Sequence, residues 1–325
     1  MNCFWLASIL LLACSIDRIA NAQFVFGSNE KGEIGSIDFA GTCEEFVAWS
    51  SGAQAKKTFN TVGCVYVRVA CCPEMTSCFR QSPKLESLWL GISPDGIDLS
   101  PGSIKELDGL ASLKELRIYG KNSKAGEISH IHNLNALEVL DFGGGVQVND
   151  LDLKAIGACE KLKSLSIECE RIDDSKWLER LTHLESLSID AKYIEDDLFQ
   201  ILPRLLELTN LTIAGIPFDE KNLAKLAETS GSKLEHLQLE LKQANVIETV
   251  RNFPLLQSLS VTTSQSGQSD FEFLRSLPRL KILYTKGWGI AVENLINPQE
   301  FKELLEMRIS DSNGLTLSHW YRAKR

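Results

Sequence analysis

The sequence predicts an α/β solenoid, in which short parallel strands stack side by side on one face and helices cover the other. Three observations lead to this fold class. An apolar triplet with the spacing i, i+3, i+5 occurs ten times between Leu85 and Ile309. Successive copies start 22 to 28 residues apart, which is the length of one strand–helix unit in repeat proteins. A second apolar pattern, with helical spacing, lies between the triplets, as at Ile247, Val250 and Phe253.

Each triplet predicts one strand with its apolar side chains facing inward, because side chains alternate between the two faces of a strand. The ten strands are expected to form one parallel sheet. The triplets are Leu85/Leu88/Leu90, Leu113/Leu116/Ile118, Leu137/Leu140/Phe142, Leu162/Leu165/Ile167, Leu184/Leu187/Ile189, Leu208/Leu211/Ile213, Leu234/Leu237/Leu239, Leu256/Leu259/Val261, Leu280/Leu283/Thr285 and Leu304/Met307/Ile309.

This L-x-x-L-x-L pattern and its period resemble the leucine-rich repeat family. The resemblance covers about two thirds of the chain and implies a horseshoe-shaped solenoid with a concave parallel sheet and helices on the convex side. We expect about ten repeats over residues 85–325, including a C-terminal end cap, and a cysteine-containing N-terminal cap over residues 23–84. The resemblance implies little about function, because members of the family share a scaffold and differ at exposed positions.

The segments between the strands are expected to be helical. Apolar residues with helical spacing occupy 177–181, 198–205, 247–253 and 271–277, and Pro254 and Pro278 are expected to end the last two helices. An acidic step precedes several of the helices: Val148-Asn149-Asp150, Ile172-Asp173-Asp174, Ile194-Glu195-Asp196 and Phe218-Asp219-Glu220. We interpret these polar residues as helix caps. A row of calcium ligands is the alternative.

Residues 1–22 are interpreted as a signal peptide. A short apolar run from Phe4 to Ile16 precedes Ala20-Asn21-Ala22, a small-x-small pattern that favours cleavage after Ala22. The run is too short to span a bilayer, and no second long run follows. We therefore expect a secreted protein, periplasmic or extracellular, without a membrane span. A lipid anchor on Cys14, in Leu11-Leu12-Ala13-Cys14, is the alternative.

The cysteines fall into two groups after the signal peptide. In an oxidising compartment, five that precede the first repeat are disulfide candidates: Cys43, Cys64, Cys71, Cys72 and Cys78. Five is an odd number, so at least one thiol is free or pairs between chains, and the spacing does not match the four-cysteine cap common in secreted leucine-rich repeat proteins, so the connectivity stays open. Zinc binding is a weaker interpretation, because the C-x2-C spacing is lacking. Aligning the repeats places Cys159 in a leucine position and Cys169 in a position for small residues, so both are expected to be buried thiols.

The residues between the core leucines face outward and are the candidate binding residues, because packing does not dictate them. Aromatic and arginine side chains, which often anchor interfaces, gather near the two ends of the repeat series, and acids lie between them. Asp141 is placed to pair with Arg117. The candidates on the concave face are Trp89, Arg117, Tyr119, Asp141, Glu168, Asp190, Glu240, Tyr284 and Arg308.

Composition narrows the classes of function. The net charge is −9 and no basic stripe occurs, so we expect no nucleic-acid partner. The five histidines are scattered, and we find neither a catalytic constellation, a metal site nor a cofactor motif. We therefore expect an exported, non-catalytic protein-interaction module that acts through its concave face on a partner with a basic surface. A cell-envelope glycan is the alternative ligand, and an enzyme housed in residues 23–84, which lack histidine, is a third hypothesis.

Overall fold

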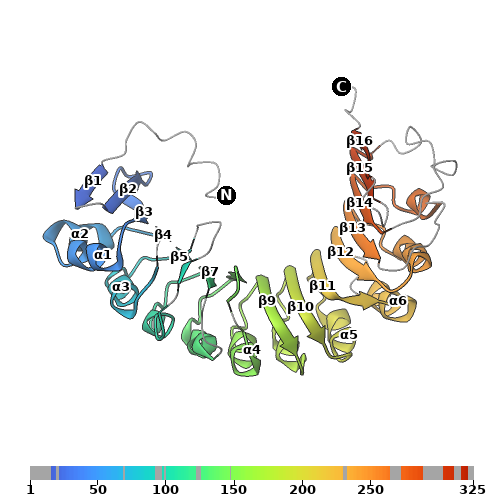
Figure 1. Cartoon of the computed structure of the whole chain (residues 1–325), viewed down its shortest axis with the longest axis horizontal. Coiled ribbons are helices and arrows are strands. Elements are labelled where there is room, and N and C mark those ends of the chain that lie inside the picture. Colours follow the sequence, from blue (N-terminus) through green and yellow to red (C-terminus); the bar gives the residue numbers. More distant parts are fainter. Residues whose placement is uncertain are drawn as a thin grey trace. The chain divides into compact units, whose positions relative to one another are not determined.

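The computed structural model describes residues 16–19, 22–68, 70–91, 97–98, 100–121, 126–146, 148–229, 233–263, 272–287, 303–310 and 316–320. The chain divides into two compact units, unit 1 (Met1–Cys169) and unit 2 (Glu170–Arg325), and each is described by itself. Within each unit the strands lie along one side and the helices along the other (Figure 1).

The sheet of unit 1 begins antiparallel and continues parallel. Strand β1 (Ile16–Ile19) pairs with β2 (Ala22–Ser28), which pairs with β3 (Ile34–Ala40), both in antiparallel register. Parallel pairing starts at β3 and continues through β4 (Cys64–Val67), β5 (Ser87–Leu90), β7 (Glu115–Lys121), β8 (Val139–Gly143) and β9 (Ser164–Ile172), which runs past the division between the units. The short β6 (Ile97–Asp98) pairs with β7.

Helical segments connect the parallel strands of unit 1. They are α1 (Cys43–Ser50), α2 (Ala53–Phe59), α3 (Pro73–Cys78), α4 (Asp150–Gly157) and the 3₁₀ helices η2 (Phe79–Gln81), η3 (Lys105–Leu107) and η4 (Glu127–Asn133). Two of the α-helices start with a capping box, in which the cap side chain and the third helical residue satisfy each other's backbone N–H groups. Thr42 and Glu45 form the box of α1, and Asn149 and Asp152 form that of α4.

Unit 2 repeats the same plan. Its parallel strands are β10 (Ser186–Ile194), β11 (Asn210–Phe218), β12 (His236–Leu241), β13 (Ser258–Thr263), β14 (Ile282–Lys286) and β15 (Glu306–Ser310), and β16 (Thr316–Trp320) adds to β15 in antiparallel register. Its helical segments are η5 (Lys176–Arg180), α5 (Leu198–Ile201), η6 (Leu202–Arg204), α6 (Glu220–Thr229), η8 (Ala244–Asn252) and η9 (Glu272–Ser276).

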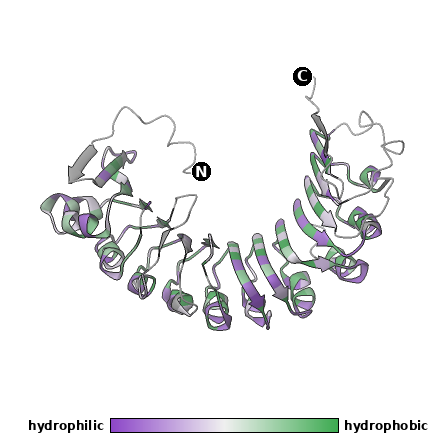
Figure 2. Ribbon diagram, viewed as in Figure 1, coloured by the Kyte–Doolittle hydropathy of each residue, from purple (hydrophilic) through white to green (hydrophobic). Residues whose placement is uncertain are grey.

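The predicted leucine triplets form the core, as expected. All of their side chains are buried, and the most exposed, Met307, has 7% of its surface accessible. Side chains of equivalent positions lie in register between strands, as Leu211 with Leu237 and Leu259 shows. Apolar and polar residues accordingly alternate in bands along the strands in Figure 2. The solenoid class with a parallel sheet is therefore confirmed.

The segments expected to be helical are helical, and most of them are 3₁₀ helices rather than α-helices. The segments expected to be helical at 177–181, 247–253 and 271–277 form 3₁₀ helices, η5, η8 and η9, and 198–205 divides between α5 and η6. A 3₁₀ helix rises about 2.0 Å per residue, against 1.5 Å in an α-helix, and so covers the length of a repeat with fewer residues. Polar residues of the acidic steps do cap backbone groups: Asp219 accepts from Asn222 N at 2.8 Å, and Asp174 from Lys176 N at 3.0 Å.

The parallel sheet starts before the first predicted repeat. Ile37 and Phe39 on β3 pair in register with Val65 and Val67 on β4, which in turn pair with Leu88 and Leu90 on β5. Two further triplets, Ile34/Ile37/Phe39 and Val62/Val65/Val67, thus have the i, i+3, i+5 spacing without leucine. Residues 23–84 therefore contain repeat-like units, and the division at residue 84 remains a prediction that does not coincide with the start of parallel pairing.

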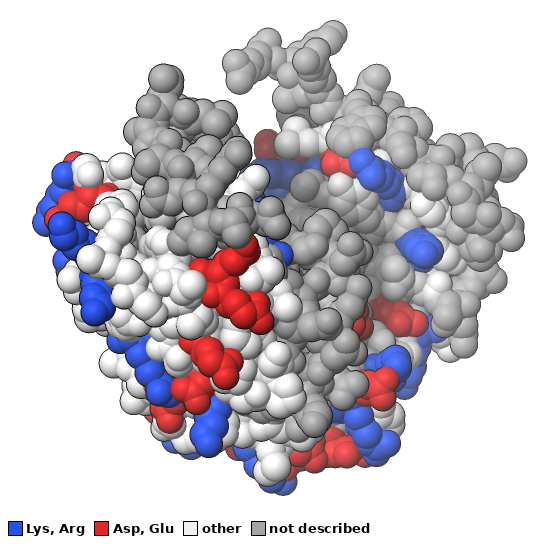
Figure 3. Space-filling model, turned by 60° about the vertical axis from the view of Figure 1, so that its left-hand side comes forward, with Lys and Arg blue, Asp and Glu red and all other residues white. Residues whose placement is uncertain are grey.

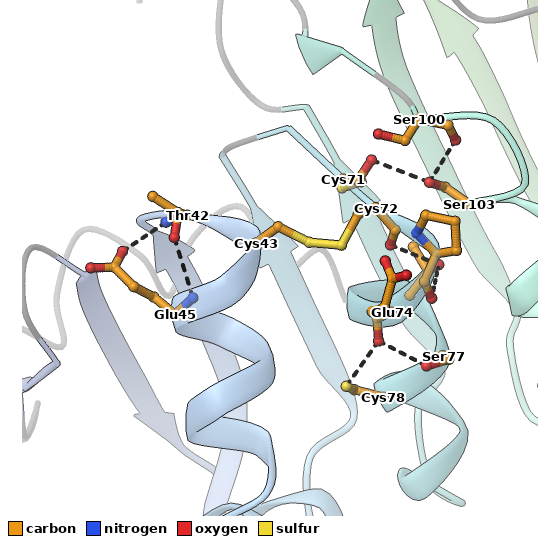
Figure 4. Close-up of a disulfide and its surroundings, with 12 residues drawn as sticks. Thr42, Cys43, Glu45, Cys71, Cys72, Glu74, Ser77, Cys78, Ser100 and Ser103 are labelled. Carbon is orange, nitrogen blue, oxygen red and sulfur yellow. Dashed lines mark hydrogen bonds between the residues drawn. A yellow bond between two sulfur atoms is a disulfide. The ribbon is translucent and has the colours of Figure 1, made fainter.

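A disulfide joins Cys43 at the start of α1 to Cys72 immediately before α3 (Figure 4). It links the two connecting segments on either side of β4. Of the other candidates, Cys71 is buried and its carbonyl accepts from Ser103 Oγ at 3.2 Å, while Cys78 Sγ lies 3.2 Å from Ser50 Oγ. Burial raises the pKa of the Cys71 thiol to about 12. The disulfide is confirmed for one pair of the five candidates.

The two repeat cysteines lie in the core, as expected. Cys159 is 4% exposed and Cys169 is 8% exposed. Burial raises the pKa of the Cys159 thiol to about 11, so the reactive thiolate is suppressed at neutral pH. Cys14 and the Ala20-Asn21 pair of the cleavage pattern lie outside the described residues.

Candidate functional site

The outward-facing positions of unit 1 form one continuous row across six strands. Strand pairing places Asp38 beside Tyr66, Tyr66 beside Trp89, Trp89 beside Arg117, Arg117 beside Asp141 and Asp141 beside Ser166. We call these six residues the unit 1 row. Their neighbours along each strand are core residues, and because side chains alternate, the row itself faces solvent and is partly exposed.

Arg117 is the centre of this row. Its Nε lies 2.7 Å from Glu115 Oε1 and its Nη1 lies 3.1 Å from Asp141 Oδ2. Its Cζ also stands 4.6 Å from the centroid of the Trp89 ring, in cation–π geometry. The ion pair expected between Arg117 and Asp141 is therefore present, and Glu115 is a second partner that the sequence did not indicate.

The aromatic members are fixed by the same network. Trp89 Nε1 donates to Ser87 Oγ at 3.0 Å, and Ser87 Oγ donates to Glu115 Oε2 at 2.8 Å. Tyr66 packs edge-on against Trp89 with a centroid distance of 5.3 Å. The Trp89 ring therefore has Arg117 on its face, Tyr66 at its side and a hydrogen-bonded nitrogen.

Tyr119 completes the cluster from the next outward position of β7. Its hydroxyl makes a short hydrogen bond to Asp141 Oδ2. Gly143 lies beside it in register, and a Cβ there would come within 3.1 Å of the Tyr119 ring, so the glycine gives the ring its space. Packing demands neither the tyrosine nor the arginine, and together they bind the same carboxylate.

The protonation states of the cluster follow from its partial burial and its charges. Burial lowers the pKa of Arg117, but hydrogen bonds to Glu115 and Tyr119 and the charges of Glu115 and Asp141 raise it, with a net increase. Burial, and then the hydrogen bond to Asp141, raise the pKa of Tyr119. Arg117 is therefore charged and Tyr119 is a neutral donor at physiological pH, in an arrangement formed before any partner arrives.

Unit 2 has a related arrangement at its last two repeats. Tyr284 and Arg308 lie in register, and Arg308 Cζ is 5.5 Å from the centroid of the Tyr284 ring. Arg308 Nε lies 2.8 Å from Glu306 Oε1, and Glu306 is 13% exposed. A hydrogen bond to Glu306, and then burial, raise the pKa of Tyr284. Unit 1 has the same arrangement. In both units an arginine stacks on an aromatic residue of the preceding strand and pairs with the glutamate two residues before it, as Arg117 does with Trp89 and Glu115.

The three predicted acids lie at outward positions of their strands and make no hydrogen bond or ion pair with the residues described above. Glu168 (β9, unit 1) and Asp190 (β10, unit 2) are exposed, and Glu240 (β12, unit 2) is partly exposed. Within the described residues, none of these three side chains makes a hydrogen bond or an ion pair.

Other charged side chains pair along the surface and are weaker candidates. On the surface shown in Figure 3, acidic and basic side chains are interspersed. Lys114 pairs with Glu86 at 2.9 Å and Lys163 with Glu138 at 2.7 Å, each joining one repeat of unit 1 to the next. In both pairs the side chains are more than a third exposed, and such pairs contribute about 0–1 kcal/mol.

Sequence reasoning missed Asp38, Tyr66 and Arg68. Arg68 Nε and Nη2 each lie 2.7 Å from an oxygen of Asp38. Asp38 is the N-terminal member of the unit 1 row, so this ion pair lies at that end of the row. The Ile34 and Val62 triplets were the signal that would have placed these residues on the outward face.

Within the described residues, no three His, Cys, Asp or Glu side chains lie close enough together to hold a metal ion, and no helix has the length and apolarity needed to cross a bilayer.

The chain belongs to the leucine-rich repeat family. The family model described as a leucine-rich repeat region matches residues 105–319, more than half of the chain. Among curated protein sequences none matches significantly.

Solved structures show the same fold at low sequence identity. A leucine-rich repeat protein of Leptospira interrogans is 19% identical with a TM-score of 0.53, over 81% of this chain and 65% of that protein. The Arabidopsis receptor kinase HAESA, solved in complex with the peptide hormone IDA and the co-receptor SERK1, is 15% identical with a TM-score of 0.54, over 88% of this chain and 48% of that chain. This chain therefore spans about two thirds of the first protein and half of the second.

Proposed function

We propose that this chain is an exported, non-catalytic binding module that holds a protein partner against the sheet face of unit 1. The observation that carries the proposal is the cluster centred on Arg117 of the unit 1 row, in which contacts with Glu115 and Asp141 hold Trp89, Arg117 and Tyr119 together. Large side chains that are already ordered lose little entropy on binding and commonly act as interface anchors.

A protein ligand fits this surface better than a glycan. Sugar rings bind aromatic side chains by stacking on an open ring face, and Arg117 covers one face of Trp89. HAESA, which shares the fold, was solved with a peptide and a protein co-receptor. The unpaired carboxylates of Glu168, Asp190 and Glu240 favour a partner with basic groups, whose attraction weakens as salt rises.

Export is supported by two features. The A-N-A pattern that ends at Ala22 is typical of signal-peptide cleavage. The Cys43–Cys72 disulfide is of the kind that persists in oxidising compartments such as the periplasm or the extracellular space.

The test is quantitative capture from the exported fraction of the host, with the parent protein and two variants, Arg117→Ala and Tyr119→Ala. If these residues are anchors, each variant captures the partner about tenfold more weakly. Arg171→Ala is the matched control, because Arg171 also stacks on an aromatic ring, that of Tyr193, but belongs to unit 2.

Two outcomes would overturn the proposal. Unchanged capture by both variants, with loss on Leu151→Asp, would move the site to the helix side, where Leu151 on α4 is 62% exposed. Specific binding of the parent on a glycan array, lost on Trp89→Ala, would replace the protein partner by a sugar.

A further inference from the structure

The outer edge of strand β2 is covered by β1, which belongs to the predicted signal peptide (residues 1–22). On one side β2 pairs with β3, and on the other it pairs with β1, from Ile16↔Val25 to Ile19↔Ala22 (Figure 1). Cleavage after Ala22 takes away the whole of β1. It leaves Gln23–Ser28 as the edge of the unit 1 sheet, with the backbone groups that faced β1 unpaired.

This new edge lacks the features that keep natural edge strands apart. Exposed edges are usually protected by lysine, proline or a bulge. The sequence Gln23-Phe24-Val25-Phe26-Gly27-Ser28 contains no charged side chain and no proline, so its one charge after cleavage is the new α-amino group of Gln23. The register irregularity against β3 comes only at the end of the strand, between Gly27 and Ser28. Val25 points outward and is 40% exposed.

The inner side of the strand is firmly packed. Phe24 is fully buried and Phe26 is 4% exposed. Their ring centroids lie 4.6 and 6.0 Å from that of Trp49 on α1. The edge is therefore a fixed, extended template, and β1 shows that it accepts an antiparallel strand.

We propose that the mature chain, from Gln23 onward, pairs with a second copy of itself through antiparallel contact of the two β2 strands. A strand with uncharged side chains, in which Val25 lies between Phe24 and Phe26, can pair with its own copy without charge repulsion between side chains. Antiparallel pairing places both copies in the same contact about a twofold axis. The contact is a single short strand, well below the area of a standard interface, so the dimer is weak and depends on concentration. The inference rests on the export part of the proposed function, because β1 must be removed, but not on the sheet-face binding site.

The test is sedimentation velocity of the exported protein over a range of concentrations, after its N-terminus is read by intact mass. We expect a monomer–dimer equilibrium in the parent. Val25→Lys, which adds a positive charge to each of the two contacting strands, should raise the dimer dissociation constant by about tenfold or more. The control is Leu206→Lys, at a side chain that is 56% exposed in unit 2, and it should dimerise as the parent does.

Equal thermal unfolding of the three proteins shows that Val25→Lys folds. A parent that is monomeric at all concentrations, a dimer unaffected by Val25→Lys, or an exported chain that still carries residues 16–19 would each overturn the inference. A monomeric parent whose capture of another protein depends on Val25 would assign the edge to that protein instead. Loss of partner capture on Arg117→Ala leaves the dimer intact, so the failure of one proposal is distinguishable from the failure of the other.

Discussion

The outward rows of the two units occupy the same strand position but differ in chemistry. In unit 1 the row contains two aromatic rings, an arginine and two acids. Tyr66 packs on Trp89, Arg117 stacks on Trp89 and pairs with Asp141, and Asp38 pairs with Arg68 on the same sheet face. In unit 2 the row is Ser188, Thr212, Gln238, Ser260, Tyr284 and Arg308, and its first four members are small or uncharged. The core beneath both rows is the same stack of leucine-like side chains.

This difference separates what folding dictates from what it leaves open. Burial fixes the inward positions, because a polar side chain there loses its hydration without compensation. It does not fix the outward positions. On the unit 1 row, large side chains contact one another across four strands, from Tyr66 through Trp89 and Arg117 to Asp141, whereas on the unit 2 row the contact joins two strands, at Tyr284 and Arg308. The contrast makes unit 1 the better candidate for binding and the outward row of unit 2 the natural control.

The largest expected effect tests the boundary between core and face. Leu187 is 1% exposed, and its neighbour Ser188 is on the outward row of unit 2. Leu187→Asp should cost about 4 kcal/mol or more of unfolding free energy, because it buries an unpaired charge. Ser188→Asp should stay within about 0.5 kcal/mol of the parent. Urea denaturation measures both, and equal midpoints would mean that the strand register is wrong.

The next largest effect is expected from reducing the Cys43–Cys72 disulfide, which should destabilise unit 1 more than unit 2. Cys43 and Cys72 are 29 residues apart. Because the crosslink lowers the conformational entropy of the unfolded chain, it is expected to add about 3–4 kcal/mol to the free energy of unfolding. Because repeats contact mainly their neighbours, reduction should loosen β3 and β4 first. Hydrogen exchange followed by mass spectrometry should show faster exchange there and little change in β12–β14. Uniform loss of protection would show that the disulfide stabilises both units alike.

A smaller difference is expected between the effects of substituting two glycines with the same backbone conformation. Gly215 in unit 2 and Gly109 in unit 1 both have φ near +89°. A Cβ on Gly215 would meet the backbone oxygen of Ala191, whereas a Cβ on Gly109 has nothing within 4 Å. Gly109→Ala should cost about 1–2 kcal/mol from the left-handed conformation alone. Gly215→Ala should cost about 2 kcal/mol more, from the clash.

Thermal unfolding of the two variants, side by side, measures that difference. A Gly109→Ala cost equal to that of Gly215→Ala would show that the approach of neighbouring repeats at Gly215 is looser than described.

Much of the fold was predictable because buried positions require apolar side chains, and these recur at a fixed spacing in the sequence. Every leucine triplet was found, since these positions require apolar side chains at fixed spacing. The copies at Ile34 and Val62 were missed because β-branched residues and phenylalanine fill the same positions there. The helices were predicted without their type, because the apolar spacing of a short segment does not distinguish an α-helix from a 3₁₀ helix. Which cysteines pair is set by chain proximity in space, which spacing does not encode.

The candidate site was predictable in part for the same reason. Alternation along the strand identified Trp89, Arg117, Tyr119 and Asp141 as outward residues. It did not identify Glu115, whose role as the second partner of Arg117 depends on side-chain direction. Tyr66 was not identified because the repeat that contains it, at Val62, was not recognised in the sequence. The residues expected to bind remain predictions until a partner is found.

The most direct test of the central claim is site-specific photo-crosslinking of the partner. A benzophenone amino acid replaces Tyr66 on the unit 1 row in one variant and Leu151 on α4 in the other, and both are irradiated with the captured partner. The account predicts a discrete covalent adduct from position 66 and none from position 151. An adduct from position 151 alone, with the partner still captured by both variants, would contradict it.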